Sequence, residues 1–225
     1  MIGSSDSTTN PFIRAFVALE LPEDARATCA ETMARARNQL GAEARLVRWV
    51  DPEGIHLTMK FLGSVRGERI GEIVDSLARD LADSVTAELA IGSLRMFPDP
   101  RAPRVIWLTL QGDLAGLRAS QERVEVALTP LGFPREKRPF QPHLTLGRVR
   151  EGTTMEQLTQ IGHLASVWPA ATGQPFHVTS ISLMQSHLSP GGARYTRIAA
   201  FPLKKGTWER FTAETQGTRR GHGEH

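Results

Sequence analysis

Apolar and polar positions alternate along several short segments of the chain, beginning with residues 12–20 (FIRAFVALE). A period of two with β-prone side chains predicts a strand, because successive side chains of a strand point to opposite faces. Clusters of Gly, Pro and Asp separate several of the other segments that have strand character. Those segments are 45–50, 55–62, 88–96, 104–110, 143–149, 177–184 and 194–201.

Apolar residues three or four positions apart predict four helices between these strands. In the first helix Cys29 belongs to the apolar stripe, so we interpret it as a core residue rather than a nucleophile. The start of the last helix is marked by Thr153 and Glu156, which have the spacing of a capping box. The predicted helices are 22–41, 68–82, 113–131 and a segment that begins at about 153.

The predicted elements do not alternate strictly between strand and helix, as they would in a Rossmann sheet. Adjacent pairs of strands favour antiparallel pairing, so the pattern predicts an α+β fold. The chain has no GxGxxG or GxxxxGK[ST] motif, so a phosphate-binding loop is not supported. No biased linker divides the chain, and we expect a single domain at 12–203 between a disordered leader at 1–11 and a disordered tail at 204–225.

Composition places the chain among ordinary globular proteins, with 40% hydrophobic and 23% charged residues. No run of about 18 apolar residues occurs, so we expect no membrane span. The single cysteine excludes an intrachain disulfide and a multi-cysteine metal site, and it favours a reducing, cytoplasmic location. The net charge of +3 suits an anionic substrate without identifying one.

The tripeptide His-Leu-Thr occurs twice, at 56–58 and 143–145, each time on a predicted strand. About 0.06 copies are expected by chance at these residue frequencies, so the repetition indicates an internal duplication. Within each copy the His and the Thr point from the same face of the strand, roughly 6.5–7 Å apart. A third His-x-Thr, at 177–179, lacks the central Leu, and we interpret it as background.

Two such strands related by pseudo-twofold symmetry would present two imidazoles and two hydroxyls to one cleft. Imidazole exchanges protons near neutral pH, and threonine hydroxyls donate hydrogen bonds to phosphoryl oxygens without adding charge. This set supplies the base, the acid and the anchors of an in-line phosphodiester displacement. The repetition therefore favours His56 and His143 as a catalytic pair.

Two other interpretations of the histidines are less consistent with the repetition. A single histidine on a half-buried strand is usually a structural residue with a hydrogen-bond partner. Paired histidines also bind zinc, but a zinc site usually needs three protein ligands. No Asp, Glu or Cys stands at metal-ligand spacing beside either histidine, so we expect no metal at this site.

The chain resembles the RNA 2′,3′-cyclic phosphodiesterases of the LigT-like type, in the two-histidine phosphoesterase superfamily. The resemblance extends over roughly residues 12–203, nearly all of the chain expected to be ordered, and the paired H-x-T motifs are its most specific part. The matching segments are RAFVA at 14–18, WV at 49–50, HLTMKFLG at 56–63, MFP at 96–98, PRVIW at 103–107, FQPHLTLGR at 140–148, LMQS at 183–186 and Tyr195.

The resemblance implies a bilobal fold, in which two pseudo-symmetric lobes of mainly antiparallel sheet with outer helices surround a central cleft. It also implies hydrolysis of RNA 2′,3′-cyclic phosphodiester ends to 2′-phosphates, without a metal ion or a cofactor. By this resemblance His56 is the acid and His143 the base, while Thr58 and Thr145 bind the substrate. The two motifs are nearly equivalent, so the residues alone do not assign the acid and the base.

Arg148 is a further substrate-binding residue that the resemblance implies. Strand parity places it on the face opposite His143, so we expect the strand to end or bulge by Gly147. The long side chains of Arg14 and Arg48 are also expected to line the cleft.

Other activities remain open at this point. The same cleft would suit a small cyclic nucleotide such as ADP-ribose 1″,2″-cyclic phosphate, or the reverse reaction, 2′–5′ RNA ligation. A non-catalytic RNA-binding module is a third alternative, although binding alone needs no proton-transfer pair. The expected partner is RNA with a 2′,3′-cyclic phosphate end, such as a tRNA fragment, or a cyclic nucleotide, and the expected state is a monomer with no membrane association.

Overall fold

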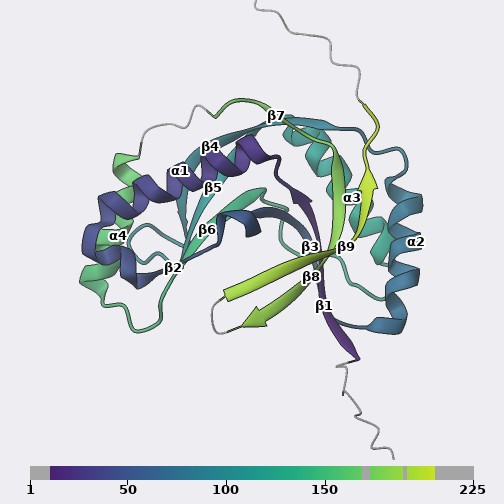
Figure 1. Ribbon diagram of the computed structural model, residues 1–225, viewed down its shortest axis with the longest axis horizontal. Helices are drawn as coiled ribbons and strands as arrows, with labels where there is room; N and C mark the ends of the chain where they lie inside the picture. The colour runs from purple at the N-terminus through teal and green to yellow at the C-terminus, as the bar shows by residue number, and fades with distance from the viewer. Residues whose placement is uncertain (1–10, 169–172, 190–191, 206–225) are drawn as a thin grey trace, which may run out of the picture.

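The computed structural model describes residues 11–168, 173–189 and 192–205. In this part of the chain the strands form two sheets, which we call sheet A and sheet B (Figure 1). Sheet A has the strand order β3-β1-β8-β9, and sheet B has the order β2-β6-β5-β4-β7. The strands of sheet A are β1 (Phe12–Glu20), β3 (His56–Arg66), β8 (Ser180–Ser189) and β9 (Gly192–Pro202). The strands of sheet B are β2 (Val47–Trp49), β4 (Ala87–Phe97), β5 (Val105–Gly112), β6 (His143–Val149) and β7 (Phe176–Val178).

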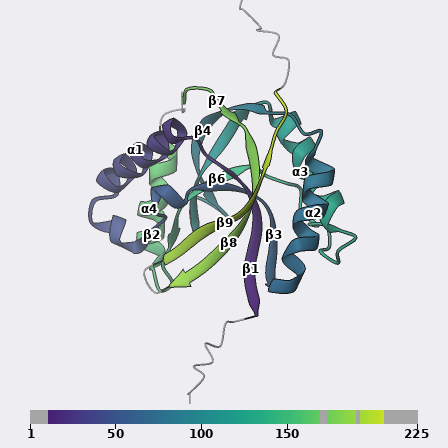
Figure 2. The same ribbon diagram turned by 45° about the vertical axis from the view of Figure 1, so that its right-hand side comes forward.

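Neighbouring strands in both sheets are antiparallel, which confirms the predicted α+β class. Helices α1 and α4 contact each other on the side of sheet B, and α2 and α3 contact each other on the side of sheet A. Figure 2 shows the strands between these two helix pairs. The helices are α1 (Glu23–Leu40), α2 (Ile70–Leu81), α3 (Leu114–Leu128) and α4 (Met155–Val167).

The first helix follows the predicted pattern, because every residue of its apolar stripe is buried. Burial raises the pKa of the Cys29 thiol to about 12, so this cysteine is a core residue and not a thiolate nucleophile at neutral pH. The capping box of α4 lies one residue later than predicted. The backbone N–H of Gln157 donates to the Thr154 hydroxyl at 3.3 Å, and the N–H of Thr154 donates to the Gln157 side chain at 3.0 Å. Thr153 with Glu156 and Thr154 with Gln157 both have the spacing of a capping box, and the structure uses Thr154 with Gln157.

Two strand predictions needed correction. The predicted strand at 45–50 is shortened to β2, because residues 41–46 form a 3-10 helix. The predicted strand at 177–184 is two strands, since the chain leaves sheet B at the end of β7 and enters sheet A at Ser180. Burial changes phase across this junction, with Val178 and Ile181 both inside, so local alternation does not show that the chain changes sheet.

One buried hydrophobic cluster contains residues from both sheets and from all four helices. The end of the described chain is attached to this body. The N–H of Lys204 donates to the Ser84 carbonyl at 2.8 Å, and its ammonium lies 2.6 Å from the Asp83 carboxylate. Apart from Pro11, Lys204 and Lys205, the predicted leader and tail lie outside the described residues. Within the described residues, no helix combines the length and the apolar character that crossing a bilayer requires.

Candidate active site

The two H-x-T motifs begin two strands of different sheets that contact each other. His56 is the first residue of β3 in sheet A, and His143 is the first residue of β6 in sheet B. Strands β3 and β6 lie together in the middle of the molecule (Figure 1). In each motif the central leucine is buried and the His and Thr on either side are half-buried, as the period of two predicts. The duplicated motif therefore forms the start of its strand in each sheet, although β3 is an edge strand and β6 is an inner strand.

The His56 ring is held by one hydrogen bond and two aromatic contacts. Its Nδ1 lies 2.7 Å from the carbonyl oxygen of Gly54. A carbonyl only accepts, so Nδ1 carries the proton and Nε2 is left for proton exchange. The ring centroid is 4.8 Å from that of Phe16 and 4.8 Å from that of Tyr195, which meets it edge-on.

The surroundings of His56 act on its pKa in opposite directions. Burial lowers the pKa below its ordinary value, and this is the largest effect. The hydrogen bond to Gly54 and the carboxylate of Glu20 both raise it, while the charge of His143 lowers it. Glu20 lies directly across from His56 in the β1–β3 pair. The two histidines are thus close enough for the charge of one to affect the protonation of the other.

His143 is anchored in the same way as His56. Its Nδ1 lies 2.9 Å from the carbonyl oxygen of Gln141, again the residue two positions earlier in the chain. Trp107 meets its ring edge-on, with the centroids 5.4 Å apart. The indole N–H of Trp107 is buried and has no hydrogen-bond partner in the described chain. Both histidines therefore have a fixed tautomer, which suits a pair that exchanges protons through Nε2.

A β-bulge in β6 brings Arg148 to the face of Thr145. Thr145 and Gly147 pair with consecutive residues of β5, so Leu146 is the extra residue. Beyond the bulge the alternation is reversed, and Arg148 is exposed while Val149 is buried. The expected bulge is present. A Cβ on Gly147 would lie 2.6 Å from a methyl group of the adjacent strand β2, which explains the glycine.

A second bulge occupies the equivalent position in β3. Thr58 and Lys60 pair with consecutive residues of β1, so Met59 is the extra residue there. Beyond it Phe61 takes the position that corresponds to Arg148 in the other motif. Its side chain is 71% exposed, and its ring lies 6.2 Å from that of Phe16.

The sequence interpretation missed Phe61, because KFLG at 60–63 has the character of core packing. Alignment of the two motifs, HLTMKF with HLTLGR, would have found it by its match to Arg148. Leu62 is buried, so of these two apolar residues only Leu62 belongs to the core. Lys60 is directed away from the site, and its ammonium contacts the buried carboxylate of Glu125 at 2.5 Å.

Two arginines contribute positive charge near His56. Burial raises the pKa of Tyr195 above its ordinary value, and the charges of Arg148 and Arg14 oppose this. Tyr195 belongs to sheet A and contacts His56, whereas Arg148 belongs to sheet B. Arg148 therefore acts on a residue of the opposite sheet, beside the histidine pair.

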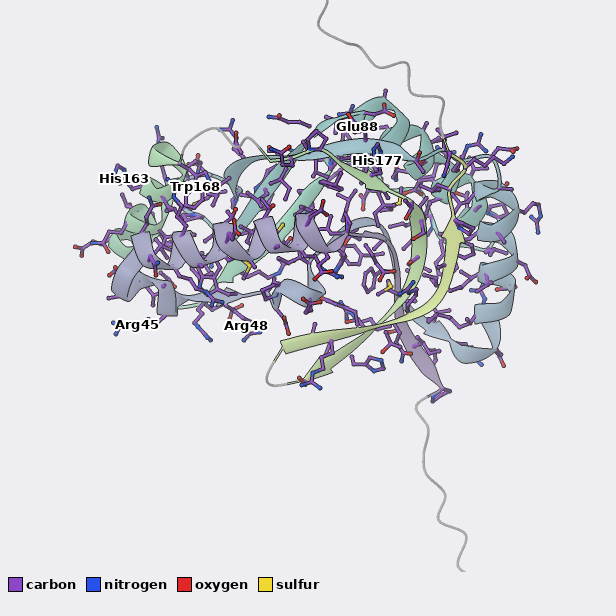
Figure 3. All side chains as sticks on the ribbon, turned by 45° about the horizontal axis from the view of Figure 1, so that its top comes forward. Arg45, Arg48, Glu88, His163, Trp168 and His177 are labelled. Carbon is purple, nitrogen blue, oxygen red and sulfur yellow. The ribbon has the colours of Figure 1, made fainter. Side chains whose placement is uncertain are left out.

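The third His-x-Thr lies elsewhere in the molecule. His177 is on β7, the edge strand of sheet B that is farthest from β2, and two strands, β5 and β4, lie between β7 and β6. Its Nε2 is 3.7 Å from the carboxylate of Glu88 (Figure 3).

Among the described residues, no three His, Cys, Asp or Glu side chains lie close enough together to hold a metal ion.

Two antiparallel sheets that each present an H-x-T strand define a two-histidine phosphoesterase fold. Residues 21–190 match the model of the 2′-5′ RNA ligase superfamily, and the chain belongs to this superfamily. This finding confirms the resemblance that the sequence motifs indicated.

Similar proteins of known name and structure match most of the chain. An RNA 2′,3′-cyclic phosphodiesterase of Methanothermobacter thermautotrophicus is 31% identical over 192 residues, which are 85% of this chain and 99% of the relative. One of Aeropyrum pernix is 32% identical over 163 residues, which are 72% of this chain and 90% of the relative. The crystal structure of E. coli LigT complexed with 3′-AMP has 25% identity and a TM-score of 0.65, covering 85% of this chain and 98% of that one.

Proposed function

We propose that this chain hydrolyses the 2′,3′-cyclic phosphodiester at the end of an RNA strand to a 2′-phosphate, with His56 and His143 as the proton-transfer pair. The observation that carries the proposal is the matched pair of imidazoles, each anchored through Nδ1, with His143 close enough for its charge to lower the pKa of His56. The relatives named RNA 2′,3′-cyclic phosphodiesterase support the choice of reaction.

In the proposed reaction water attacks the phosphorus on the side opposite the 3′ oxygen. His143 takes a proton from the water through Nε2 as the new P–O bond forms. His56 gives a proton to the 3′ oxygen as the P–O3′ bond breaks, so the phosphate stays on the 2′ oxygen. Glu20 supports His56 as the acid, because its carboxylate favours the protonated imidazole. Each proton transfer typically contributes about 10²–10⁴ in rate.

The other side chains bind the substrate in this proposal. The hydroxyls of Thr58 and Thr145 donate hydrogen bonds to the non-bridging oxygens, and Arg148 balances the charge that develops there. The exposed ring of Phe61 offers a surface on which the terminal base stacks. These groups supply an acid, a base and anchors, so the reaction as written needs no metal ion or cofactor.

The test is turnover of 2′,3′-cyclic AMP by the full chain, with and without EDTA. We expect unchanged hydrolysis in EDTA and a 2′-phosphate product, which phosphorus NMR distinguishes from a 3′-phosphate. Activity that is lost in EDTA and restored by zinc or manganese would contradict the metal-free reaction. A 3′-phosphate product would contradict the choice of leaving oxygen, and an absence of turnover would contradict hydrolysis.

A second candidate is 2′–5′ RNA ligation, which the name of the superfamily favours. It is the same displacement with a 5′-hydroxyl in place of water: the new P–O bond forms as the P–O3′ bond breaks, and the same acid and base would serve. Both reactions suit tRNA fragments with cyclic phosphate ends. Since one chain carries both histidines, a monomer suffices for either reaction. Incubation of a cyclic phosphate end with a 5′-hydroxyl RNA, followed by electrophoresis, distinguishes joining from hydrolysis.

A further inference from the structure

We propose that the open face of sheet B beside His143 binds the RNA strand on the 5′ side of the cyclic phosphate. This inference rests on the proposed function. The surface consists of Arg48 on β2 together with Arg95 and Phe97 on β4, and we call it the arginine face. Because the cyclic phosphate is the 3′ end of the strand, the rest of an RNA substrate extends only from its 5′ side.

The register of sheet B places these residues on one face. Arg48 is directly opposite Arg148, Arg148 is opposite Val105, and Val105 is opposite Phe97. Residues directly opposite in antiparallel strands point to the same side of the sheet. The row crosses four strands and is therefore roughly 14 Å long at the usual strand spacing. In Figure 3 Arg48 on β2 lies far from Glu88 on β4 and from His177 on the edge strand β7.

A second row connects the arginine face to the proposed reaction centre. Arg95 is opposite Trp107, and Trp107 is opposite Thr145. The Trp107 ring also contacts the His143 ring. A substrate whose terminal phosphate lies at His143 and Thr145 would thus have Arg95 two strands away and Arg48 next to Arg148.

The two arginines of this surface and the neighbouring Arg148 have no carboxylate partner among the described residues. Arg48, Arg95 and Arg148 are all exposed, and none of them forms an ion pair with a carboxylate in the part of the chain that the structure describes. Several other arginines of the chain do have such partners: Arg26, Arg66, Arg69, Arg135 and Arg197. Like charges directly opposite across strands are destabilising, so the Arg48–Arg148 pair is best explained by an anion that binds between them.

An exposed aromatic ring completes the chemistry of the surface. The side chain of Phe97 is 52% exposed and lies two residues from Arg95 on the same face. Guanidinium groups bind phosphates, and an exposed ring stacks on a base of any identity. The combination of cations with a stacking ring on an open sheet is typical of single-stranded RNA binding.

The test uses the full chain and two measurements. The first is the ratio of kcat/KM for a six-nucleotide RNA ending in adenosine 2′,3′-cyclic phosphate to kcat/KM for 2′,3′-cyclic AMP. The second is binding of a 5′-fluorescein RNA with a 3′-hydroxyl end, followed by fluorescence anisotropy at several salt concentrations. The variants are Arg48→Ala, Arg95→Ala, Phe97→Ala and Phe97→Trp, with Arg118→Ala on α3 as the control.

We expect the wild-type ratio to exceed about ten at low salt and to fall as salt is added. Each arginine variant should lower the ratio by about three- to tenfold, and should reduce the slope of log Kd against log salt by about 0.7, the value for one lost phosphate contact on a single strand. Phe97→Ala should also lower the ratio, Phe97→Trp should preserve it, and Arg118→Ala should leave both measurements unchanged.

The two measurements separate failure of this inference from failure of the proposed function. A wild-type ratio near one without salt dependence would overturn the arginine face, while turnover of both substrates would still support the hydrolase. Equal losses on both substrates in the arginine variants would also overturn it, since the arginines would then serve the terminal phosphate alone. Arginine-dependent RNA binding by a chain without turnover would support the surface and contradict the proposed reaction.

Discussion

At the scale of single residues, the two histidines have different surroundings although their motifs are nearly the same. His56 lies between Phe16 and Tyr195, and Glu20 lies across from it on β1. His143 has the Trp107 ring as its aromatic contact. This difference makes the residues around His56 the better place to test which histidine is the acid.

Glu20→Gln should shift the pH dependence of hydrolysis toward lower pH on its alkaline side. The Glu20 carboxylate raises the pKa of His56, so its removal lowers this pKa further. An acid with a lower pKa loses its proton at lower pH, and the alkaline limb of kcat/KM moves with it. Gln retains an oxygen that can accept from Ser182, which donates to Glu20 at 2.5 Å. An unmoved alkaline limb would contradict the role of His56 as the acid.

His56→Ala and His143→Ala should each reduce the turnover of 2′,3′-cyclic AMP by at least about 100-fold, because each removes one proton transfer. The double variant should be little worse than the poorer single variant, since the two residues act as a unit. His177→Ala is the matched control and should stay near wild type, because His177 lies on the far edge strand of sheet B. Steady-state kinetics with a circular dichroism check of folding decides the outcome. A similar loss in a folded His177→Ala protein would show that the choice of motifs is wrong.

Phe61→Ala should raise KM for 2′,3′-cyclic AMP by about five- to fiftyfold and leave kcat nearly unchanged, as loss of one base stack predicts. Ribose 2′,3′-cyclic phosphate has no base, so its kinetics should not change. Phe61→Trp should restore the lower KM. The control is Phe12→Ala, since Phe12 is 45% exposed at the start of β1 and belongs to no proposed site. An equal effect on both substrates would exclude base stacking.

At the scale of elements, the two bulges decide which side chains reach the site. In an unbroken strand Arg148 would point to the other face of the sheet from His143. The extra residue Leu146 reverses the alternation and brings Arg148 to the face of His143. Period and motif repetition predict the strands, the helices and the His–Thr pairs, because these depend on local spacing. A bulge depends on the partner strand, as does the division of 177–184 between two sheets, so neither can be derived from local alternation alone. The bulge in β3 depends on its partner strand in the same way, although alignment of the two motifs would have marked Phe61 by its match to Arg148.

The buried ion pair between Lys60 and Glu125 connects β3 to α3, next to the bulge at Met59. Both side chains are 5% exposed, and the Lys60 ammonium also donates to the Pro134 carbonyl at 2.7 Å. Lys60→Met leaves the Glu125 carboxylate buried without its cation, and should reduce the free energy of unfolding by about 3–5 kcal/mol. The pair Lys60→Met with Glu125→Leu should recover most of this loss, because no charge is then buried alone. Urea unfolding measures both, and a loss below about 1 kcal/mol in the single variant would contradict this account.

At the scale of the whole molecule, the two sheets share one core although each supplies one histidine. The buried cluster includes Val17 and Leu57 from sheet A together with Leu108 and Leu144 from sheet B. A shared core couples the two halves, because unfolding either half would expose apolar surface of the other.

We therefore expect the chain to unfold in a single thermal transition. The calorimetric enthalpy should equal the van't Hoff enthalpy, as it does for two-state unfolding. Of the four tryptophans of the chain, Trp49 and Trp107 lie in sheet B and none lies in a strand of sheet A among the described residues, whereas hydrolysis requires both sheets. Tryptophan fluorescence and residual activity, measured during the same slow heating, should therefore change together. If sheet A unfolded independently, activity would disappear at a lower temperature than the fluorescence change, and the single-domain prediction for 12–203 would be wrong.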